Sequence, residues 1–240
     1  MSTDTSAPTI VLVHGAFADS SSWNGVVERL RAQGHSVIAA ANPLRGLDSD
    51  AAYVASVLDS VEGPCVLVGH SYGGSVITVA AAGKSNVEAL VYIAAFIPDE
   101  GESALQLTDK FPGSTLGPTT RPASYPLPDG GTGTELYIRQ EQFHQQFAAD
   151  VPAATAELMA ATQRPVALDA LQQPATATAW RGIRSYALIT GEDKNIPVEA
   201  QRFMAQRAGS EAVEVAASHA VSVSTPDVVA ALIARAAAGE

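Results

Sequence analysis

Residues 69–73, Gly-His-Ser-Tyr-Gly, place a serine between two glycines, a spacing that suits a nucleophile on a sharp turn. An apolar run at 64–68 precedes this pentapeptide, and a second apolar run at 76–82 follows it. This order predicts a strand, a tight turn and a helix, with the hydroxyl of Ser71 exposed at the carboxyl end of the strand. The glycines carry no Cβ, so the strand and the helix can approach closely. We therefore predict that Ser71 is a nucleophile, although a Gly-Ser turn without chemistry would share the pattern.

A serine hydroxyl is a weak nucleophile and needs a base that accepts its proton. On sheets of this type the chain order is nucleophile, acid, histidine, so the base should follow Ser71. Two histidines do so: His144, which lies among glutamines, and His219, which follows the last predicted strand. We predict that His219 is the base and that His144 is an exposed residue. The alternative is that His219 only caps the last helix.

An acidic residue should orient the imidazole of the base and stabilise its cation. Asp193 is the best candidate, because it lies in residues 190–197, directly after the fifth predicted strand. Asp99 lies directly after the fourth strand, could reach the same histidine and is the rival candidate. As a further alternative, Glu192 and Asp193 could be ordinary N-terminal charges of the helix that begins at Pro197.

The reaction of a serine nucleophile also needs an oxyanion hole, in which two backbone amides face the developing negative charge. One amide should be that of Tyr72, which directly follows the predicted nucleophile. The other should come from the loop at 14–17, which follows the first predicted strand. In that loop we favour the amide of Ala16 over the amide of Phe17.

Six runs have the composition of strands, and most of them alternate with segments of helical periodicity. The predicted strands are residues 9–13, 36–41, 65–68, 87–96, 186–190 and 212–216. The predicted helices are residues 23–33, 51–58, 197–207 and the segment from Thr225 onward. Alternating strands and helices imply an α/β fold with a mostly parallel sheet and helices on both faces.

The alternation stops between residues 97 and 179, a stretch that contains most of the prolines. Within it, residues 135–148 and 153–162 are predicted to be helical. We interpret 97–179 as a cap or lid inserted over the sheet, so that 1–96 and 180–240 form the core. Large apolar side chains in this segment and directly after it could line a pocket, although for each one we favour the core of the cap: Phe111, Tyr125, Tyr137, Phe143, Phe147, Met159 and Trp180.

Together these features resemble the α/β-hydrolase superfamily, and especially the small plant-type methylesterase and hydroxynitrile lyase group and its bacterial relatives. The residues that carry the resemblance are 11–16, Trp23, 69–74, Asp193 and His219. The resemblance implies a catalytic triad of Ser71, Asp193 and His219 and oxyanion amides at Ala16 and Tyr72. Only eight residues precede the first predicted strand, so the N-terminal meander of larger members is expected to be missing, which leaves about six strands.

The same resemblance separates enzyme classes. Hydroxynitrile lyases of this group carry threonine where this chain has Gly15, and lysine directly after the catalytic histidine, where this chain has Ala220. Haloalkane dehalogenases need a carboxylate nucleophile, which Ser71 excludes. We therefore expect a serine hydrolase that cleaves small to medium uncharged carboxylic esters or lactones. The alternatives are a cofactor-free lyase or C–C bond hydrolase with the same triad, or a non-catalytic small-molecule receptor on this fold.

The composition argues against several other classes. The 14 basic and 25 acidic residues give a net charge of −11 with no basic cluster, which argues against a nucleic-acid partner. No apolar run is long enough to span a membrane, and the polar leader at 1–8 does not resemble a signal peptide, so we expect a cytoplasmic protein. Cys65, the single cysteine, is expected in the core. We expect no metal and no organic cofactor, a small molecule as the partner, and compatibility with a homodimer.

Overall fold

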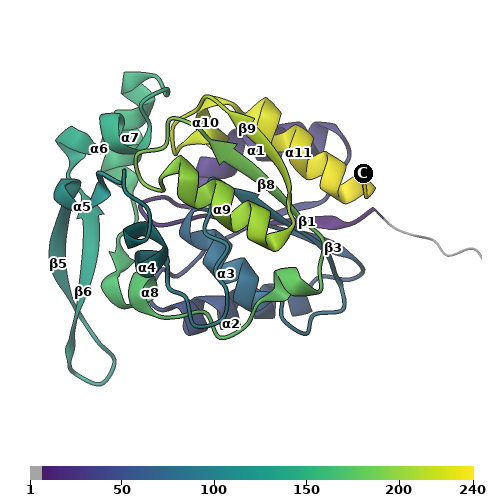
Figure 1. Cartoon of the computed structure of the whole chain (residues 1–240), viewed down its shortest axis with the longest axis horizontal. Helices are drawn as coiled ribbons and strands as arrows, with labels where there is room; N and C mark the ends of the chain where they lie inside the picture. Colours follow the sequence, from purple (N-terminus) through teal and green to yellow (C-terminus); the bar gives the residue numbers. More distant parts are fainter. Residues whose placement is uncertain (1–6) are drawn as a thin grey trace, which may run out of the picture.

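The computed structural model describes residues 7–240, and its centre is a sheet of six parallel strands (Figure 1). In spatial order these strands are β2 (Val37–Ala40), β1 (Thr9–Val13), β3 (Cys65–His70), β4 (Val87–Ile93), β8 (Ser185–Thr190) and β9 (Glu211–Val215). The order reverses between β1 and β3, and the carboxyl ends of strands at such a switch point are where ligand sites form in open α/β sheets. The predicted α/β class and the six parallel strands are confirmed.

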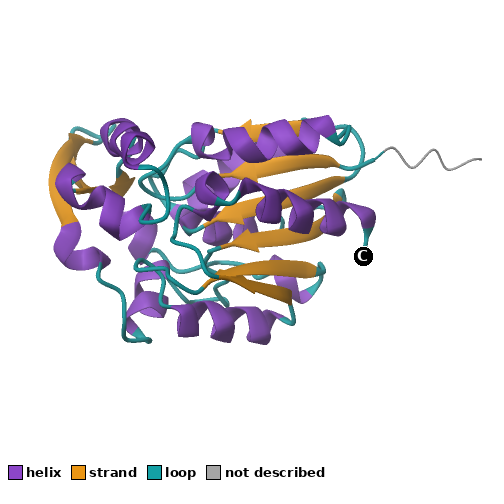
Figure 2. Ribbon diagram, turned by 90° about the horizontal axis from the view of Figure 1, so that it is seen from above, coloured by secondary structure: helices purple, strands orange, loops and turns teal. Residues whose placement is uncertain are grey.

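Helices cover both faces of this sheet (Figure 2). One apolar cluster joins α1 (Asn24–Ala32) and α11 (Pro226–Ala238) to one face, and a larger cluster joins α2 (Leu47–Asp59), α3 (Tyr72–Ala80) and α9 (Val198–Ala208) to the other. In β1, Ile10 and Leu12 belong to the first cluster, whereas Val11 and Val13 belong to the second. Because side chains alternate along a strand, a continuous apolar run is what a sheet buried on both faces requires.

The segment 97–179 forms short helices and a second, three-stranded antiparallel sheet at one end of the molecule (Figure 1). The strands are β5 (Thr120–Pro126), β6 (Thr132–Ile138) and β7 (Val166–Ala167). The helices are α4 (Ala104–Asp109), α5 (Leu116–Thr119), α6 (Gln140–Phe147), α7 (Ala153–Thr162) and α8 (Leu168–Gln172). Three further short helices lie elsewhere in the chain: η1 (Ser20–Trp23), η2 (Ala179–Arg181) and α10 (Val221–Ser224).

Two predicted boundaries, one in this segment and one just before it, need correction. The helix predicted over 135–148 is wrong in its first five residues, because β6 pairs with β5 through a turn in which Gly130 has a φ of +85°. The strand predicted over 87–96 is too long, because Ala94 has a φ of 44° and cannot continue a strand. The helix predicted at 153–162 is confirmed as α7.

Residues 1–6, which make up most of the polar leader, lie outside the described residues, so the prediction that this leader is not a signal peptide stays a prediction. Among residues 7–240, no helix combines the length and the apolar composition that crossing a bilayer demands.

Candidate active site

Ser71 occupies the sharp turn between β3 and α3, with a φ of 54° and a ψ of −124°. An L-residue rarely adopts a positive φ, and such strain persists only where the surrounding structure holds it. Three backbone hydrogen bonds do so here: the Ser71 amide donates to the Ile93 carbonyl at 3.2 Å, and the Ser71 carbonyl accepts from Gly74 at 2.9 Å and from Phe96 at 3.1 Å. The turn is thereby fixed on the end of β4 as well as on its own helix.

Four glycines around this turn are fixed by close backbone contacts. A Cβ on Gly15 would lie 2.6 Å from the Cβ of Ser71, and one on Gly69 would lie 2.5 Å from the carbonyl oxygen of Gly73. A Cβ on Gly73 would lie 2.5 Å from the Val13 oxygen, and one on Gly74 would lie 2.2 Å from the Phe96 oxygen. Real Cβ contacts are essentially never this short, so any larger residue would push the loop after β1, the strand or the helix away from the serine.

His219 and Asp193 form a buried hydrogen-bonded pair. The Nδ1 atom of His219 lies 2.7 Å from Oδ2 of Asp193, and both side chains are essentially inaccessible to solvent. Asp193 lies in the turn between β8 and α9, and both of its oxygens accept further hydrogen bonds. Oδ2 also accepts from Thr190 Oγ1 and Gln201 Nε2 at 3.0 Å each, while Oδ1 accepts the amides of Asn195 at 2.8 Å and Ile196 at 3.0 Å. A buried carboxylate held by this many donors has a fixed orientation, which a group that orients an imidazole requires.

The structure places the rival carboxylate elsewhere. Asp99 binds the guanidinium of Arg181 at 2.7 and 2.8 Å, and its side chain is 27% exposed. The hydrogen bond from Arg181 holds the pKa of Asp99 below its usual value. Of the two candidates, Asp193 is therefore the one in contact with His219.

The backbone and ring of His219 are held by two neighbouring aromatic residues. Nε2 of His70 lies 2.8 Å from the His219 carbonyl oxygen, which can only accept, so His70 carries its proton on Nε2. Burial lowers the pKa of His70 to about 3, so its ring stays neutral beside His219, with ring centres 4.7 Å apart. Phe147, from α6, packs edge-on against His219 at 4.9 Å. A neutral His70 would not repel a positive charge on the neighbouring His219 ring.

The loop of His219 is also tied to the 97–179 segment through Asp150. The carboxylate of Asp150 accepts a hydrogen bond from the amide of Ser218 at 3.0 Å and another from the Ser218 hydroxyl. Partial burial raises the pKa of Asp150, but the hydrogen bonds from Ser218 outweigh it and the pKa is lowered overall. The His144 ring, predicted to be exposed, is instead partly buried, with its Nε2 2.9 Å from the Val151 carbonyl oxygen.

The three candidate oxyanion amides differ in their hydrogen bonding. Tyr72 is the first residue of α3, a position whose amide has no intrahelical acceptor. The amide of Phe17 donates to the Arg164 carbonyl at 3.1 Å, so it is already used within the protein. Ala16 lies beside it in the loop after β1 and lines the same cavity as Ser71. The Tyr72 side chain points away from the site and donates its hydroxyl to the buried Asp50 at 2.9 Å.

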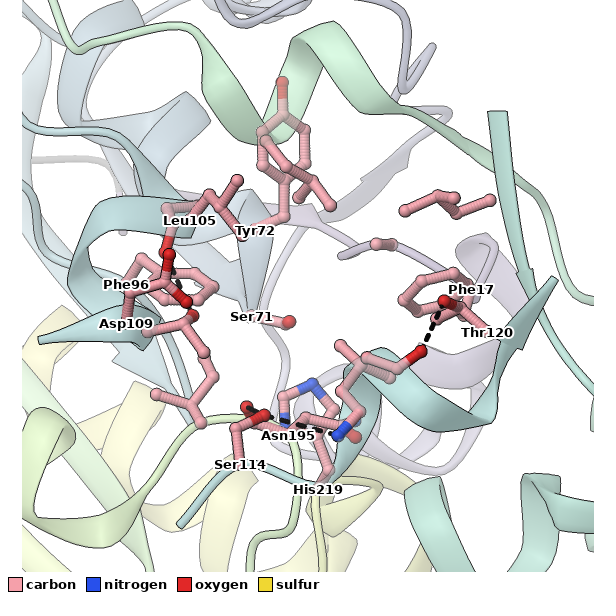
Figure 3. Close-up of a pocket in the computed structure, with 18 of the residues that line it drawn as sticks. Phe17, Ser71, Tyr72, Phe96, Leu105, Asp109, Ser114, Thr120, Asn195 and His219 are labelled. Atoms are coloured by element: carbon pink, nitrogen blue, oxygen red, sulfur yellow. Dashed lines mark hydrogen bonds between the residues drawn. The ribbon is translucent and has the colours of Figure 1, made fainter. Parts of the chain in front are cut away.

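Ser71 and His219 both line one cavity of about 400 Å³ (Figure 3). Its walls are mainly apolar and come from the loop after β1, from α4 and α5, and from the turn before α9. Of the seven large side chains considered from the sequence, Phe111 lines this cavity, whereas Phe143 and Phe147 are buried in the core. Among residues 7–240, no group of three or more His, Cys, Asp or Glu side chains is arranged to hold a metal ion.

Sequence reasoning missed two residues that surround the predicted site. Asp150 and Ser218 are 68 residues apart in the sequence, and no local sequence pattern predicts their contact. Asn195, two residues after Asp193, lines the cavity. A polar residue in the same turn as the predicted acid was the sequence signal that could have indicated this position.

Comparison with known proteins identifies a family and several relatives. The model of the Alpha/beta hydrolase family matches residues 10–232. A carbendazim hydrolyzing esterase from Nocardioides sp. (strain SG-4G) is 34% identical over an alignment of 113 residues that covers 42% of this chain and 47% of that protein. The alpha/beta hydrolase nvfD from Aspergillus novofumigatus (strain IBT 16806) is 29% identical over an alignment of 256 residues that covers 97% of each chain.

Solved structures with the same fold include two esterases. Polyneuridine aldehyde esterase superposes with a TM-score of 0.83 at 20% identity, over 95% of this chain and 98% of the other. The methylesterase MES16 from Arabidopsis superposes with a TM-score of 0.80 at 18% identity, over 97% of this chain and 100% of the other. At these identities the likeness concerns the fold, and it agrees with the plant-type methylesterase resemblance noted from the sequence.

Proposed function

The chain belongs to the alpha/beta hydrolase family, and from that premise we propose that it is a serine hydrolase whose triad is Ser71, Asp193 and His219. The observation that carries the proposal is that a strained Ser71 lines the same cavity as His219, whose ring is hydrogen-bonded to the buried Asp193. The positive φ of Ser71 costs backbone strain, and the burial of two ionisable side chains costs desolvation. Proteins retain such costly features together where chemistry uses them.

In the proposed reaction, Oγ of Ser71 attacks the ester carbonyl while Nε2 of His219 accepts its proton. Asp193 keeps the proton of His219 on Nδ1 and stabilises the imidazolium that forms. The carbonyl oxygen becomes an oxyanion and accepts hydrogen bonds from the backbone amides of Ala16 and Tyr72. His219 then gives its proton to the departing alcohol, which leaves an acyl group on Ser71. A water molecule, deprotonated by His219, hydrolyses this acyl-enzyme.

The cavity supports small to medium, uncharged esters or lactones as the substrate class. Its volume of about 400 Å³ and its mainly apolar walls suit a compact acyl or alcohol group. The net charge of −11 opposes the approach of anions. Esterase activity in the relatives, as stated in the names of the carbendazim hydrolyzing esterase and polyneuridine aldehyde esterase, supports ester hydrolysis as the reaction type.

The test is active-site labelling together with kinetics. A fluorophosphonate should add one mass adduct to the wild type and none to Ser71→Ala, and Ser71→Ala should lose p-nitrophenyl butyrate hydrolysis by on the order of 10⁴-fold. Ser114→Ala is the matched control, because Ser114 lines the same cavity but donates its hydroxyl to the Asn195 carbonyl at 2.9 Å. This control should still be labelled.

Two outcomes would contradict the proposal. An adduct that persists in Ser71→Ala would place the nucleophile elsewhere. Mandelonitrile cleavage that equals ester turnover would make the protein a lyase, against the argument from Gly15 and Ala220.

A further inference from the structure

A buried carboxyl group lies behind the serine turn and has no part in the proposed reaction. Asp50, in the first turn of α2, is fully buried. Its oxygens accept the backbone amide of Arg45 at 3.1 and 3.2 Å, and Oδ2 also accepts the hydroxyl of Tyr72 at 2.9 Å. The guanidinium of Arg45 pairs with Glu135 instead, at 2.6 Å. Asp50 thus accepts its hydrogen bonds from neutral groups, and burial raises its pKa above the usual value.

The partners of this carboxyl group indicate why the chain keeps it buried. A carboxyl group that has only neutral donors costs folding free energy when it leaves water. The Arg45 amide belongs to the loop directly before α2, whereas Tyr72 belongs to α3, which packs against α2. Figure 3 shows the Tyr72 side chain directed away from Ser71. Asp50 therefore anchors the residue that directly follows the predicted nucleophile, and it does so on the side away from Ser71.

The anchored residue carries one of the two amides in the proposed oxyanion hole. This amide belongs to the Ser71–Tyr72 peptide, which is planar and trans, so its N–H points opposite to the Ser71 carbonyl. The carbonyl end of the plane is fixed by hydrogen bonds from Gly74 at 2.9 Å and Phe96 at 3.1 Å. The other end is the Cα atom of Tyr72, whose side chain ends at Asp50. Without this second anchor the plane can turn about its fixed carbonyl end, which moves the amide.

We propose that Asp50 is a positioning residue that sets the direction of the Tyr72 amide through the Tyr72 hydroxyl. In this scheme Asp50 touches neither the substrate nor the reacting atoms. Its effect is on the transition state, because an oxyanion donor contributes only when it points at the position of the developing charge. The inference rests on the proposed serine hydrolase function, in which the oxyanion accepts a hydrogen bond from this amide.

The test measures the preference of the enzyme for oxygen over sulfur at the reacting centre. p-Nitrophenyl butyrate is paired with O-(p-nitrophenyl) thionobutyrate, which releases the same phenolate but develops its negative charge on sulfur. Sulfur is larger and a weaker acceptor, so a correctly directed amide favours the oxygen ester. The measured quantity is the oxo-to-thiono ratio of kcat/KM, divided by the same ratio for alkaline hydrolysis. A loss of packing alone would slow both esters and leave this corrected ratio unchanged.

In the wild type the corrected ratio should favour the oxygen ester by about 100-fold. Tyr72→Phe removes the hydroxyl and Asp50→Ala removes its acceptor, and each should lower the ratio by about tenfold, because the amide is misdirected rather than lost. The double variant should match Asp50→Ala, because both changes break the same contact. Tyr92→Phe is the matched control. It removes a buried hydroxyl that lies 2.9 Å from Thr78 of the same helix α3, and it should keep the wild-type ratio.

A wild type without preference for the oxygen ester overturns the inference, and so does a Tyr72→Phe variant within about twofold of the wild-type ratio. A Tyr92→Phe variant that falls as far as Tyr72→Phe overturns it too, as does a double variant in which the two losses multiply. If Asp50→Ala fails to fold, the comparison of Tyr72→Phe with Tyr92→Phe still decides. Failure of the proposed function looks different, because hydrolysis of both esters would then persist in Ser71→Ala.

Discussion

Replacement of Asp193 by asparagine tests the central hydrogen bond of the site. The change keeps the size of the side chain but removes its charge and turns one acceptor into a donor. In the native site both oxygens accept hydrogen bonds, with a side-chain cluster on Oδ2 and two backbone amides on Oδ1. An amide group therefore meets a conflict in either orientation.

The magnitude follows from the two orientations. If the new NH₂ group takes the place of Oδ2, it faces Nδ1 of His219 and Nε2 of Gln201, and His219 must move its proton to Nε2. Such a histidine cannot accept the proton of Ser71. If the NH₂ group takes the place of Oδ1, it opposes the backbone amides of Asn195 and Ile196. A tautomer change of this kind lowers kcat by on the order of 10⁴-fold. That factor corresponds to about 5 kcal/mol of transition-state stabilisation.

The assay is p-nitrophenyl butyrate hydrolysis by the wild type, Asp193→Asn and Asp99→Asn, with circular dichroism to confirm folding. Asp99 pairs with Arg181 at the surface, where an ion pair contributes little, so Asp99→Asn should stay within about twofold of the wild type. A folded Asp193→Asn that keeps more than a tenth of the activity would refute the reasoning. A larger loss in Asp99→Asn would show that the acid follows β4 rather than β8.

Three further predictions concern the frame of the site. Gly15→Ala should lower kcat/KM by about 100-fold, because the new Cβ would displace Ser71. Gly182→Ala is the control, because its Cβ would have no heavy atom within 4 Å, and it should leave kcat/KM unchanged. Equal effects of the two substitutions would contradict the steric argument. Asp150→Ala should lower kcat by about fivefold and also lower the melting temperature, because it leaves the buried Ser218 amide without its acceptor and frees the loop of His219; an unchanged kcat would remove Asp150 from that role. Burial lowers the pKa of His14 to about 4 and that of His70 to about 3 in the folded protein. In the unfolded chain both pKa values return to about 6.5, so below that pH the unfolded chain binds protons that the folded chain does not. The free energy of unfolding in urea should therefore fall as the pH drops from about 6.5 to 4, and a constant value would contradict the neutral state of both rings.

The parts that the sequence predicted well are those with a strong local cause. The turn at 69–73 carries its own glycines, each of which is required by a backbone contact too short for a Cβ. The strands buried on both faces, such as β3, are apolar almost without interruption, and no surface helix has that pattern. The last helix begins at Pro226, where proline fits the first turn.

The parts that were missed depend on contacts between distant segments. The sequence favoured Asp193 but left Asp99 open, because the two residues follow neighbouring parallel strands at the same edge of the sheet. Arg181 forms the ion pair with Asp99, and its position is set by the tertiary fold. The residues of strand β6 from Glu135 onward have no clear alternation and so favour a helix in the sequence, whereas the partner strand β5 supplies the hydrogen bonds that decide their conformation.

The turn between β8 and α9 joins the proposed chemistry to the 97–179 segment. Asp193 is held from the core side, by Thr190 of β8 and Gln201 of α9. Asn195, two residues later, is held from the 97–179 segment, by Gln146 of α6 and by Ser114. The two side chains have different side-chain partners, although the Asn195 backbone amide also donates to Asp193. Substitutions in α6 can therefore change the cavity wall at Asn195 while the Asp193–His219 hydrogen bond keeps its geometry. In this arrangement the 97–179 segment can alter substrate preference without rebuilding the triad, which is how one hydrolase core can serve many esters.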